Sequence, residues 1–148
     1  MTMMAQKFGK VNTQTIMQAL PDVAKANGEL EALQKQKDNE LKAMQDELNR
    51  KLDEYQKGQS TMNATAKQQK ETELQGLNQK IQQAYQDGQQ ELQKKSNELM
   101  QPIVAKVRAA IDAVGKAGNY TYIFEEGAAI YTGSNVVDVT KEVQSKIK

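Results

Sequence analysis

Residues 28–55 read GELEALQKQKDNELKAMQDELNRKLDEY, and this stretch decides the fold of the chain. Its apolar side chains recur three, four or a small multiple of about 3.5 residues apart, and they are Leu30, Leu33, Leu41, Met44, Leu48, Leu52 and Tyr55. This spacing aligns them along one face of a helix, among Lys, Glu, Gln and Asp residues that favour water. The stretch therefore predicts a long helix that packs against another helix, as in a coiled coil.

A second periodic run follows and is at least as long as the first. Its apolar residues are Leu74, Leu77, Ile81, Tyr85, Leu92, Leu99, Ile103, Val107, Ile111 and Val114. Between the runs, in residues 57–69, Gly, Ser, Thr and Asn gather and the apolar repeat is lost. We therefore predict an antiparallel helical hairpin, with residues 25–103 as an arm and its tip near residues 57–69. Pro102 should kink the returning helix, and Gly76 and Gly88 either loosen it or permit close packing.

The segment before the hairpin predicts a strand and a short helix. Residues 7–11, KFGKV, can form a strand, after which Asn12 and Thr13 are suited to cap a helix. Pro21 then interrupts the apolar helical face, and Asp22 is suited to begin the next helix. We therefore expect the first helix to be brief and a kink or restart near Pro21.

The segment after the hairpin is rich in β-forming residues. Residues 120–124, YTYIF, predict a strand, and residues 128–131, AAIY, can pair back with it as a β-hairpin. Thr140 is suited to cap a final amphipathic helix that contains Val143 and Ile147. The predicted fold class is therefore α+β, with a long antiparallel, coiled-coil-like helical hairpin on a small β-body. Because so few short strands are marginal in a monomer and leave free edges, we expect several chains to complete the body together.

Composition removes several classes of function. The 148 residues have a mean hydropathy of -0.78 and 5% aromatic residues, which is little material for a conventional globular core. A formal net charge of +1 argues against nucleic acid as a partner. The chain has no Cys and no His, so it lacks thiol chemistry, the usual general base and the commonest metal ligand. We therefore expect no enzyme, no cofactor and no metal site, and we find no apolar run long enough for a membrane span.

Both ends of the chain resemble one known family. The closing segment TYIFEEGAAIYTGSNVVDVTKEVQSKIK, residues 121–148, is similar to the end of the Skp/OmpH family, where Asp138, Val139 and Thr140 match its D-hydrophobic-T helix start. The opening segment KFGKVNTQTIM, residues 7–17, resembles the first strand and helix of that family. The resemblance covers residues 6–148, and its specificity lies in the two ends.

The resemblance implies an ATP-independent periplasmic chaperone, a holdase. Members form homotrimers in which a small intersubunit β-barrel carries helical arms, and the arms enclose unfolded outer-membrane β-barrel proteins. On this basis residues 6–24 and 104–148 form a discontinuous trimerisation body. The candidates for the core of that body are Phe8, Val11, Tyr122, Phe124 and Ile130. One departure is charge: well-studied members are strongly basic, whereas this chain is near neutral, which favours capture through dispersed apolar and amide contacts.

Four arm residues are candidates for contact with an unfolded client: Met44, Tyr55, Met62 and Tyr85. Met is flexible and polarizable, which suits weak contacts with varied partners. Met62 stands apart from the apolar repeat and is expected to be exposed at the tip. Met44 alternatively belongs to the core between the helices, and Tyr55 and Tyr85 alternatively pack against each other across the hairpin.

Two further features carry alternative interpretations. Lys94 and Lys95 resemble a basic pair that is associated with lipopolysaccharide binding in some members, but they also fit an ordinary solvated helix face. Residues 1–5 are interpreted either as the remnant of a removed signal peptide, processed near Ala5, or as a cloning remnant or ordinary terminus. The first interpretation agrees with a periplasmic location.

Two other functions stay open at the level of sequence. A coiled-coil spacer or adaptor would bind one folded partner through a defined apolar patch, one to one. A cytosolic prefoldin-like chaperone would act by a similar mechanism with a different topology, and an encoded signal peptide upstream would separate the two compartments.

Overall fold

The computed structural model describes residues 5–147 and divides into two units. The mixed unit comprises residues 5–27 and 97–147, and the helical unit comprises residues 28–96. In chain order the elements are β1 (Phe8–Val11), α1 (Thr13–Ala19), α2 (Pro21–Gly58), the 3-10 turn η1 (Gln59–Thr61), α3 (Ala64–Ala117), β2 (Tyr122–Glu125), β3 (Val137–Asp138) and α4 (Thr140–Lys146). The expected leader remnant at residues 1–5 lies outside the described residues, except for Ala5.

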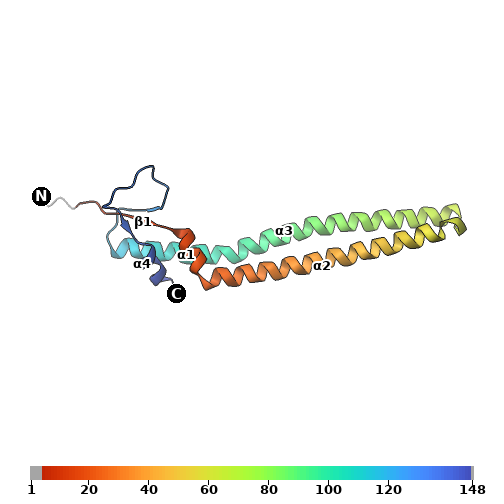
Figure 1. Ribbon diagram of the computed structural model, residues 1–148, viewed down its shortest axis with the longest axis horizontal. Helices are drawn as coiled ribbons and strands as arrows, with labels where there is room; N and C mark the ends of the chain where they lie inside the picture. Colours follow the sequence, from red (N-terminus) through yellow and green to blue (C-terminus); the bar gives the residue numbers. More distant parts are fainter. Residues whose placement is uncertain (1–4, 148) are drawn as a thin grey trace. The chain divides into compact units, whose positions relative to one another are not determined.

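The helical unit is an antiparallel pair made by α2 and α3, which lie side by side (Figure 1). The connection is shorter than the expected tip, because α2 continues to Gly58 and α3 begins at Ala64. Asn63 starts α3 by accepting a hydrogen bond from the Ala66 N–H at 2.8 Å, which satisfies one of the free donors of the first turn. Helix α3 then continues without interruption through Pro102.

Helix α1 begins and ends as its sequence predicts. The Asn12 side chain accepts a hydrogen bond from the Thr15 N–H at 2.9 Å and so caps the helix. Leu20 separates α1 from α2 in an extended conformation, and α2 then starts at Pro21. Proline suits this position because its fixed φ fits a helix and its missing N–H would have had no partner there.

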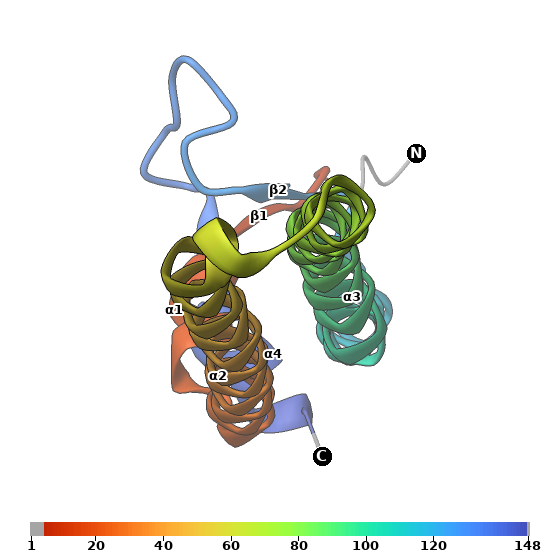
Figure 2. The same ribbon diagram turned by 90° about the vertical axis from the view of Figure 1, so that its right-hand side faces the viewer.

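The sheet corrects one expectation. Its strand order is β2-β1-β3, and both outer strands run parallel to β1 (Figure 2 shows β1 beside β2). Phe8 pairs with Tyr122, and Gly9 pairs with both Ile123 and Val137. Residues 128–131 form no strand, so the predicted β-hairpin with residues 120–124 is wrong.

The chain leaves β2 in another direction because its acidic end bonds to α1. The Glu125 carboxylate accepts a hydrogen bond from the Thr13 N–H, and the Glu126 carboxylate accepts one from the Asn12 amide, both at 3.0 Å. Gly127 follows at φ 87, a left-handed conformation that glycine adopts without strain. The segment after it forms the connection to β3, which a parallel strand requires in place of a tight turn.

The core of the mixed unit joins both ends of the chain. Its buried residues come from β1, α1, α3 and the segment around α4, and they are Val11, Ile16, Val107, Ala110, Val114, Val139 and Val143. Ile16, Val139 and Val143 are completely enclosed. Each fully buried aliphatic side chain contributes about 1.5–3 kcal/mol, so this small cluster holds the two ends together.

The start of α4 differs in detail from the expectation. Thr140 is the first helical residue and Val139 is the N-cap, so Thr140 does not cap the helix; its N–H donates to the Asp138 carboxylate at 3.0 Å. The Thr140 hydroxyl donates to the same carboxylate at 2.7 Å and accepts from the Asn12 N–H at 3.0 Å. The helix start is therefore tied to the end of β1.

The two hydrogen bonds from Thr140 to Asp138 predict a pH-dependent contribution to stability. The Thr140 hydroxyl and then its N–H hold the pKa of Asp138 below its ordinary value of 3.8. Because the folded pKa is lowered, this stabilisation is present above the ordinary pKa and is lost as the pH falls through the folded pKa. The free energy of unfolding of the native chain should therefore fall between about pH 6 and about pH 3. That of Asp138→Asn should fall by about 0.5 kcal/mol less, a small difference because the carboxylate is exposed.

Urea unfolding at the two pH values measures this difference. The control is Asp112→Asn, since Asp112 is an exposed aspartate of α3 in the same unit. An equal change in both variants would contradict a specific role for the hydrogen bonds to Asp138.

Among residues 5–147, no helix combines the length and the apolar character of a membrane span.

Candidate functional site

The apolar stripe of the helical unit is only half-buried. Within residues 28–96, Leu48 is the only large apolar side chain that is buried. The stripe residues of intermediate exposure are Leu30, Leu33, Leu41, Met44, Tyr55, Met62, Leu74, Leu77, Ile81 and Leu92. Leu52 and Tyr85 are exposed, Tyr85 by 57%. The contact between α2 and α3 thus leaves part of the apolar surface of both helices open to solvent, most of all at Tyr85.

At one level of the helical unit, a salt bridge between α2 and α3 takes the place of an apolar pair. The Lys37 side chain of α2 lies across Gly88 of α3. A Cβ atom added at Gly88 would lie 3.8 Å from the Lys37 side chain. Its ammonium pairs with Glu91 at 2.6 Å and with Glu40 at 3.6 Å, and the hydrogen bond to Glu91 raises the pKa of Lys37. Gly88 therefore serves close packing, since a long cationic side chain covers it with its methylene groups.

A second set of polar links joins the helices near the tip. Lys51 pairs with Glu73, which raises the pKa of Lys51 and lowers the pKa of Glu73. The Tyr55 hydroxyl donates to the Glu71 carboxylate at 2.6 Å, and this hydrogen bond raises the pKa of Tyr55. These links between α2 and α3 hold the hairpin in register with little apolar burial.

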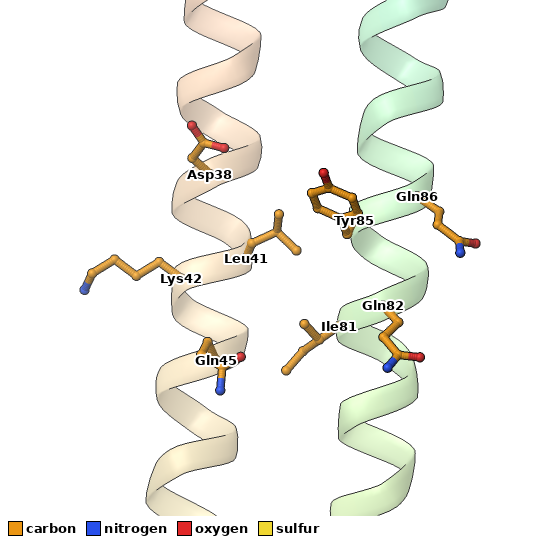
Figure 3. Close-up of a pocket in the computed structure, with 8 residues that line it drawn as sticks. All are labelled: Asp38, Leu41, Lys42, Gln45, Ile81, Gln82, Tyr85 and Gln86. Carbon is orange, nitrogen blue, oxygen red and sulfur yellow. The ribbon is translucent and has the colours of Figure 1, made fainter.

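A pocket opens between the helices beside Tyr85. Leu41 of α2 and Ile81 and Tyr85 of α3 point toward the space between the helices (Figure 3). The remaining lining residues are polar or charged, and they are Asp38, Lys42, Gln45, Gln82 and Gln86. The pocket has a volume of about 630 Å³. It combines an apolar floor with a rim of amides and two charged side chains.

A smaller pocket lies at the tip. Tyr55, Met62 and Leu74 share it with Lys51 and three more charged residues, in a volume of about 260 Å³. Met62 is half-buried there and not fully exposed as expected, because its methyl group folds back against Gly58. The tip pocket is therefore more polar than the one beside Tyr85.

The structure separates the four candidate contact residues. Tyr55 and Met62 lie together at the tip, whereas Tyr85 lines the other pocket with Leu41. The alternative in which Tyr55 and Tyr85 pack together is wrong, since each lies in its own pocket and Tyr55 bonds to Glu71. Met44 is half-buried along the stripe.

The two lysines of the basic pair on α3, Lys94 and Lys95, are not equally accessible to an anionic ligand. Lys94 is exposed, while Lys95 is half-buried and lies 4.0 Å from the Glu29 carboxylate of α2. This pairing offsets part of the charge that would attract an anionic ligand.

The candidate body residues fall on two sides of the sheet. Val11 belongs to the core, whereas Phe8, Tyr122 and Phe124 stack in a row on the opposite face, with ring centroids 6.1 and 5.5 Å apart. Tyr122 and Phe124 are exposed by 59% and 46%, and Ile130 is fully exposed on the loop after β2. This alternation follows from the pleat of a strand, which turns successive side chains to opposite faces.

One contributor to the contact between α2 and α3, Lys37, was not expected from the sequence, whereas close packing was one of the two interpretations of Gly88. Lys37 and Gly88 occupy gaps in the apolar repeats, between Leu33 and Leu41 on α2 and between Tyr85 and Leu92 on α3. The gaps themselves were a signal, because a coiled coil seldom leaves a seam position to lysine opposite glycine. Within residues 5–147, no group of three or more acidic side chains is placed to hold a metal ion.

Comparisons of the sequence with known proteins point to one family. The family model described as "Outer membrane protein (OmpH-like)" matches residues 7–147. The chain is 26% identical over 144 residues to the "Chaperone protein Skp" of Pectobacterium atrosepticum, and the match covers 97% of this chain and 87% of the relative. The protein of the same name from Yersinia enterocolitica is 25% identical over 144 residues with the same coverage.

A comparison of structures agrees with the fold. The crystal structure of an OmpH-like outer membrane chaperone from Caulobacter crescentus CB15 matches with a TM-score of 0.84, over 97% of this chain and 85% of that chain. At 14% identity this likeness concerns the fold alone. It confirms the predicted α+β class with long helices and a small sheet.

Proposed function

This chain belongs to the OmpH-like family of outer membrane proteins, and we propose that it is an ATP-independent holdase for unfolded outer-membrane β-barrel proteins. The observation that carries the proposal is the half-buried apolar stripe of the helical unit. Two helices that only held each other together would bury this stripe, as coiled-coil seams do. Here the salt bridges of Lys37 with Glu91 and of Lys51 with Glu73 hold the hairpin, and apolar atoms are left for contact with another chain.

A holdase also needs weak contacts that are spread over its surface. Tight binding of one segment would prevent release in the absence of an energy source, whereas many weak contacts exchange rapidly and add up. The two pockets, the exposed Leu52 and the half-buried Met44 offer such contacts along the hairpin. The helical unit has eleven Lys and Arg against twelve Asp and Glu, so dispersed apolar contact, and no basic field, is the proposed basis of capture.

The proposal includes a homotrimer in the periplasm. Support comes from the family and from the mixed unit, whose three-stranded sheet has an exposed aromatic face formed by Phe8, Tyr122 and Phe124. Small sheets with exposed apolar faces gain stability when copies cover one another. On this proposal Ile130 also joins the covered surface, and a signal peptide directs export.

Two further parts of the proposal concern ligands and catalysis. A lipopolysaccharide contact at Lys94 and Lys95 has the weaker support, because Glu29 already pairs with Lys95. We also propose that the protein is not an enzyme, since its relatives are named chaperones and its sequence lacks His and Cys.

The direct test is the aggregation of an outer-membrane β-barrel protein diluted from urea, followed by light scattering. Stoichiometric amounts of the chain should suppress scattering almost completely without ATP, and an equal mass of an unrelated soluble protein should not. Equally fast aggregation in both samples would contradict the holdase. Mass measurement of the free protein tests the trimer separately, and a monomer would contradict that part of the proposal.

A further inference from the structure

The pocket beside Tyr85 has the size and floor of a site for one large side chain. Its volume of about 630 Å³ lies within the range of about 300–1,000 Å³ that small-ligand pockets occupy. Leu41, Ile81 and Tyr85 supply the apolar floor, and Figure 3 shows them directed into the space between α2 and α3. The ring of Tyr85 is more than half exposed, so a guest side chain can stack on it and withdraw it from water.

Both charged side chains at the rim already have a partner on the same helix. Asp38 accepts a hydrogen bond from the Gln34 amide at 2.9 Å, and Lys42 pairs with Asp46 at 3.2 Å. An anionic guest would therefore find Lys42 already paired, and a guest of either charge would lose water on the apolar floor. The pocket thus complements an uncharged guest.

Two glutamines at the rim complement a peptide backbone. Gln83 donates to Asp87 at 2.8 Å, but Gln82 and Gln86 make no side-chain hydrogen bond to the described part of the chain. Each of their amides offers donors and an acceptor, which match the N–H and C=O groups of an extended chain that has no partners of its own. In Figure 3 the Gln86 side chain points away from α2 and the Gln82 side chain lies across α3, so a bound segment could run along that helix.

We propose that the pocket formed by Leu41, Ile81 and Tyr85 is a subsite for one aromatic or aliphatic side chain of an extended, uncharged peptide segment. This inference rests on the proposed function, because the segment belongs to an unfolded client. In an extended segment successive side chains point to opposite sides, so alternating apolar and small polar residues place one side chain in the pocket and the backbone beside the glutamines. Binding to this subsite depends little on salt.

Labelled peptides and the full chain test the subsite. The probes are short serine–threonine peptides that are identical except for one central residue, which is tryptophan, serine, glutamate or lysine. Fluorescence anisotropy should show the tryptophan peptide binding about tenfold tighter than the others. Its affinity should change by less than about twofold between about 0.05 M and about 0.5 M sodium chloride, since the tryptophan side chain and the glutamine amides carry no charge.

Variants of the chain assign the binding to the pocket. Tyr85→Ala should weaken the tryptophan peptide about fivefold or more, and Tyr85→Phe should keep the native affinity, because the ring supplies the contact. Gln82→Ala combined with Gln86→Ala should weaken binding about threefold. The matched control is Gln90→Ala, an exposed position on the same helix outside this pocket, which should have no effect. Alanine favours helix, so these variants should fold, as circular dichroism can verify.

The outcomes separate the subsite from the holdase. Unchanged affinity of Tyr85→Ala, a preference for the charged peptides, or a steep loss of affinity with salt would overturn the subsite. If barrels stay soluble with the native chain while Tyr85→Ala binds normally, the subsite is wrong and the holdase stands. If peptides bind through Tyr85 but barrels aggregate unhindered, the subsite stands and the holdase fails.

Discussion

Deleting residues 28–96 and joining Asn27 to Asn97 through a short Gly–Ser linker should abolish protection of unfolded barrels while the mixed unit still folds. The deletion removes both pockets and the half-buried stripe, which carry the proposed client contacts. It spares the entire core of the mixed unit, whose buried residues all lie in residues 5–27 and 97–147. In this variant barrels should therefore aggregate unhindered, whereas thermal unfolding should still show a cooperative transition of the mixed unit.

The control for this deletion keeps the helical unit. The same linker is inserted between Ser60 and Thr61, in the exposed 3-10 turn outside both pockets, and this variant should protect barrels as the native chain does. If the deleted chain still suppressed aggregation, the client surface would belong to the mixed unit. If it lost cooperative unfolding, the mixed unit would depend on the helical unit for its stability.

Ile16→Ala should lower the free energy of unfolding of the mixed unit by about 2–4 kcal/mol. Ile16 is completely enclosed in the cluster that joins α1 to Val139 and Val143 near the C-terminus. Removing its side chain leaves a cavity as well as losing transfer free energy, and so small a core has few other contacts to compensate. Urea unfolding followed by circular dichroism measures the loss.

An exposed aliphatic residue of the same unit supplies the comparison. Val104 of α3 is 52% exposed, so Val104→Ala should change stability by less than about 0.5 kcal/mol. Equal losses in the two variants would contradict the assignment of Ile16 to the core. On the proposed function, Ile16→Ala should also weaken protection at temperatures where the mixed unit begins to unfold.

Local signals were sufficient for the helices. The spacing of apolar residues predicted the two long helices, and Asn12 and Pro21 marked boundaries that the structure confirms. These features depend on side chains within a few residues of one another, which a linear sequence displays directly. The tip was placed less sharply, because Ser, Thr and Asn near residues 60–65 indicate both a turn and the first turn of a helix.

The sheet could not be predicted in the same way. Residues 128–131 have the composition of a second strand, yet β2 pairs with β1, more than a hundred residues earlier in the chain. The choice depends on Glu125 and Glu126, which bond to the start of α1 and turn the chain away. Strand composition indicates the presence of a strand but carries no information on a distant partner.

By itself the sequence determined a near-neutral helical hairpin between two short β segments, because helical periodicity and caps are local properties. Only the tertiary structure decided that the two ends join in a parallel sheet, because that pairing depends on contacts between distant residues. The tertiary structure also decided that the apolar stripe is half-open, since the same repeat is compatible with a closed seam. Interhelical salt bridges, among them that of Lys37 beside Gly88, hold the helices together. They leave Leu41, Ile81 and Tyr85 around an open pocket. The proposed function depends on that open stripe.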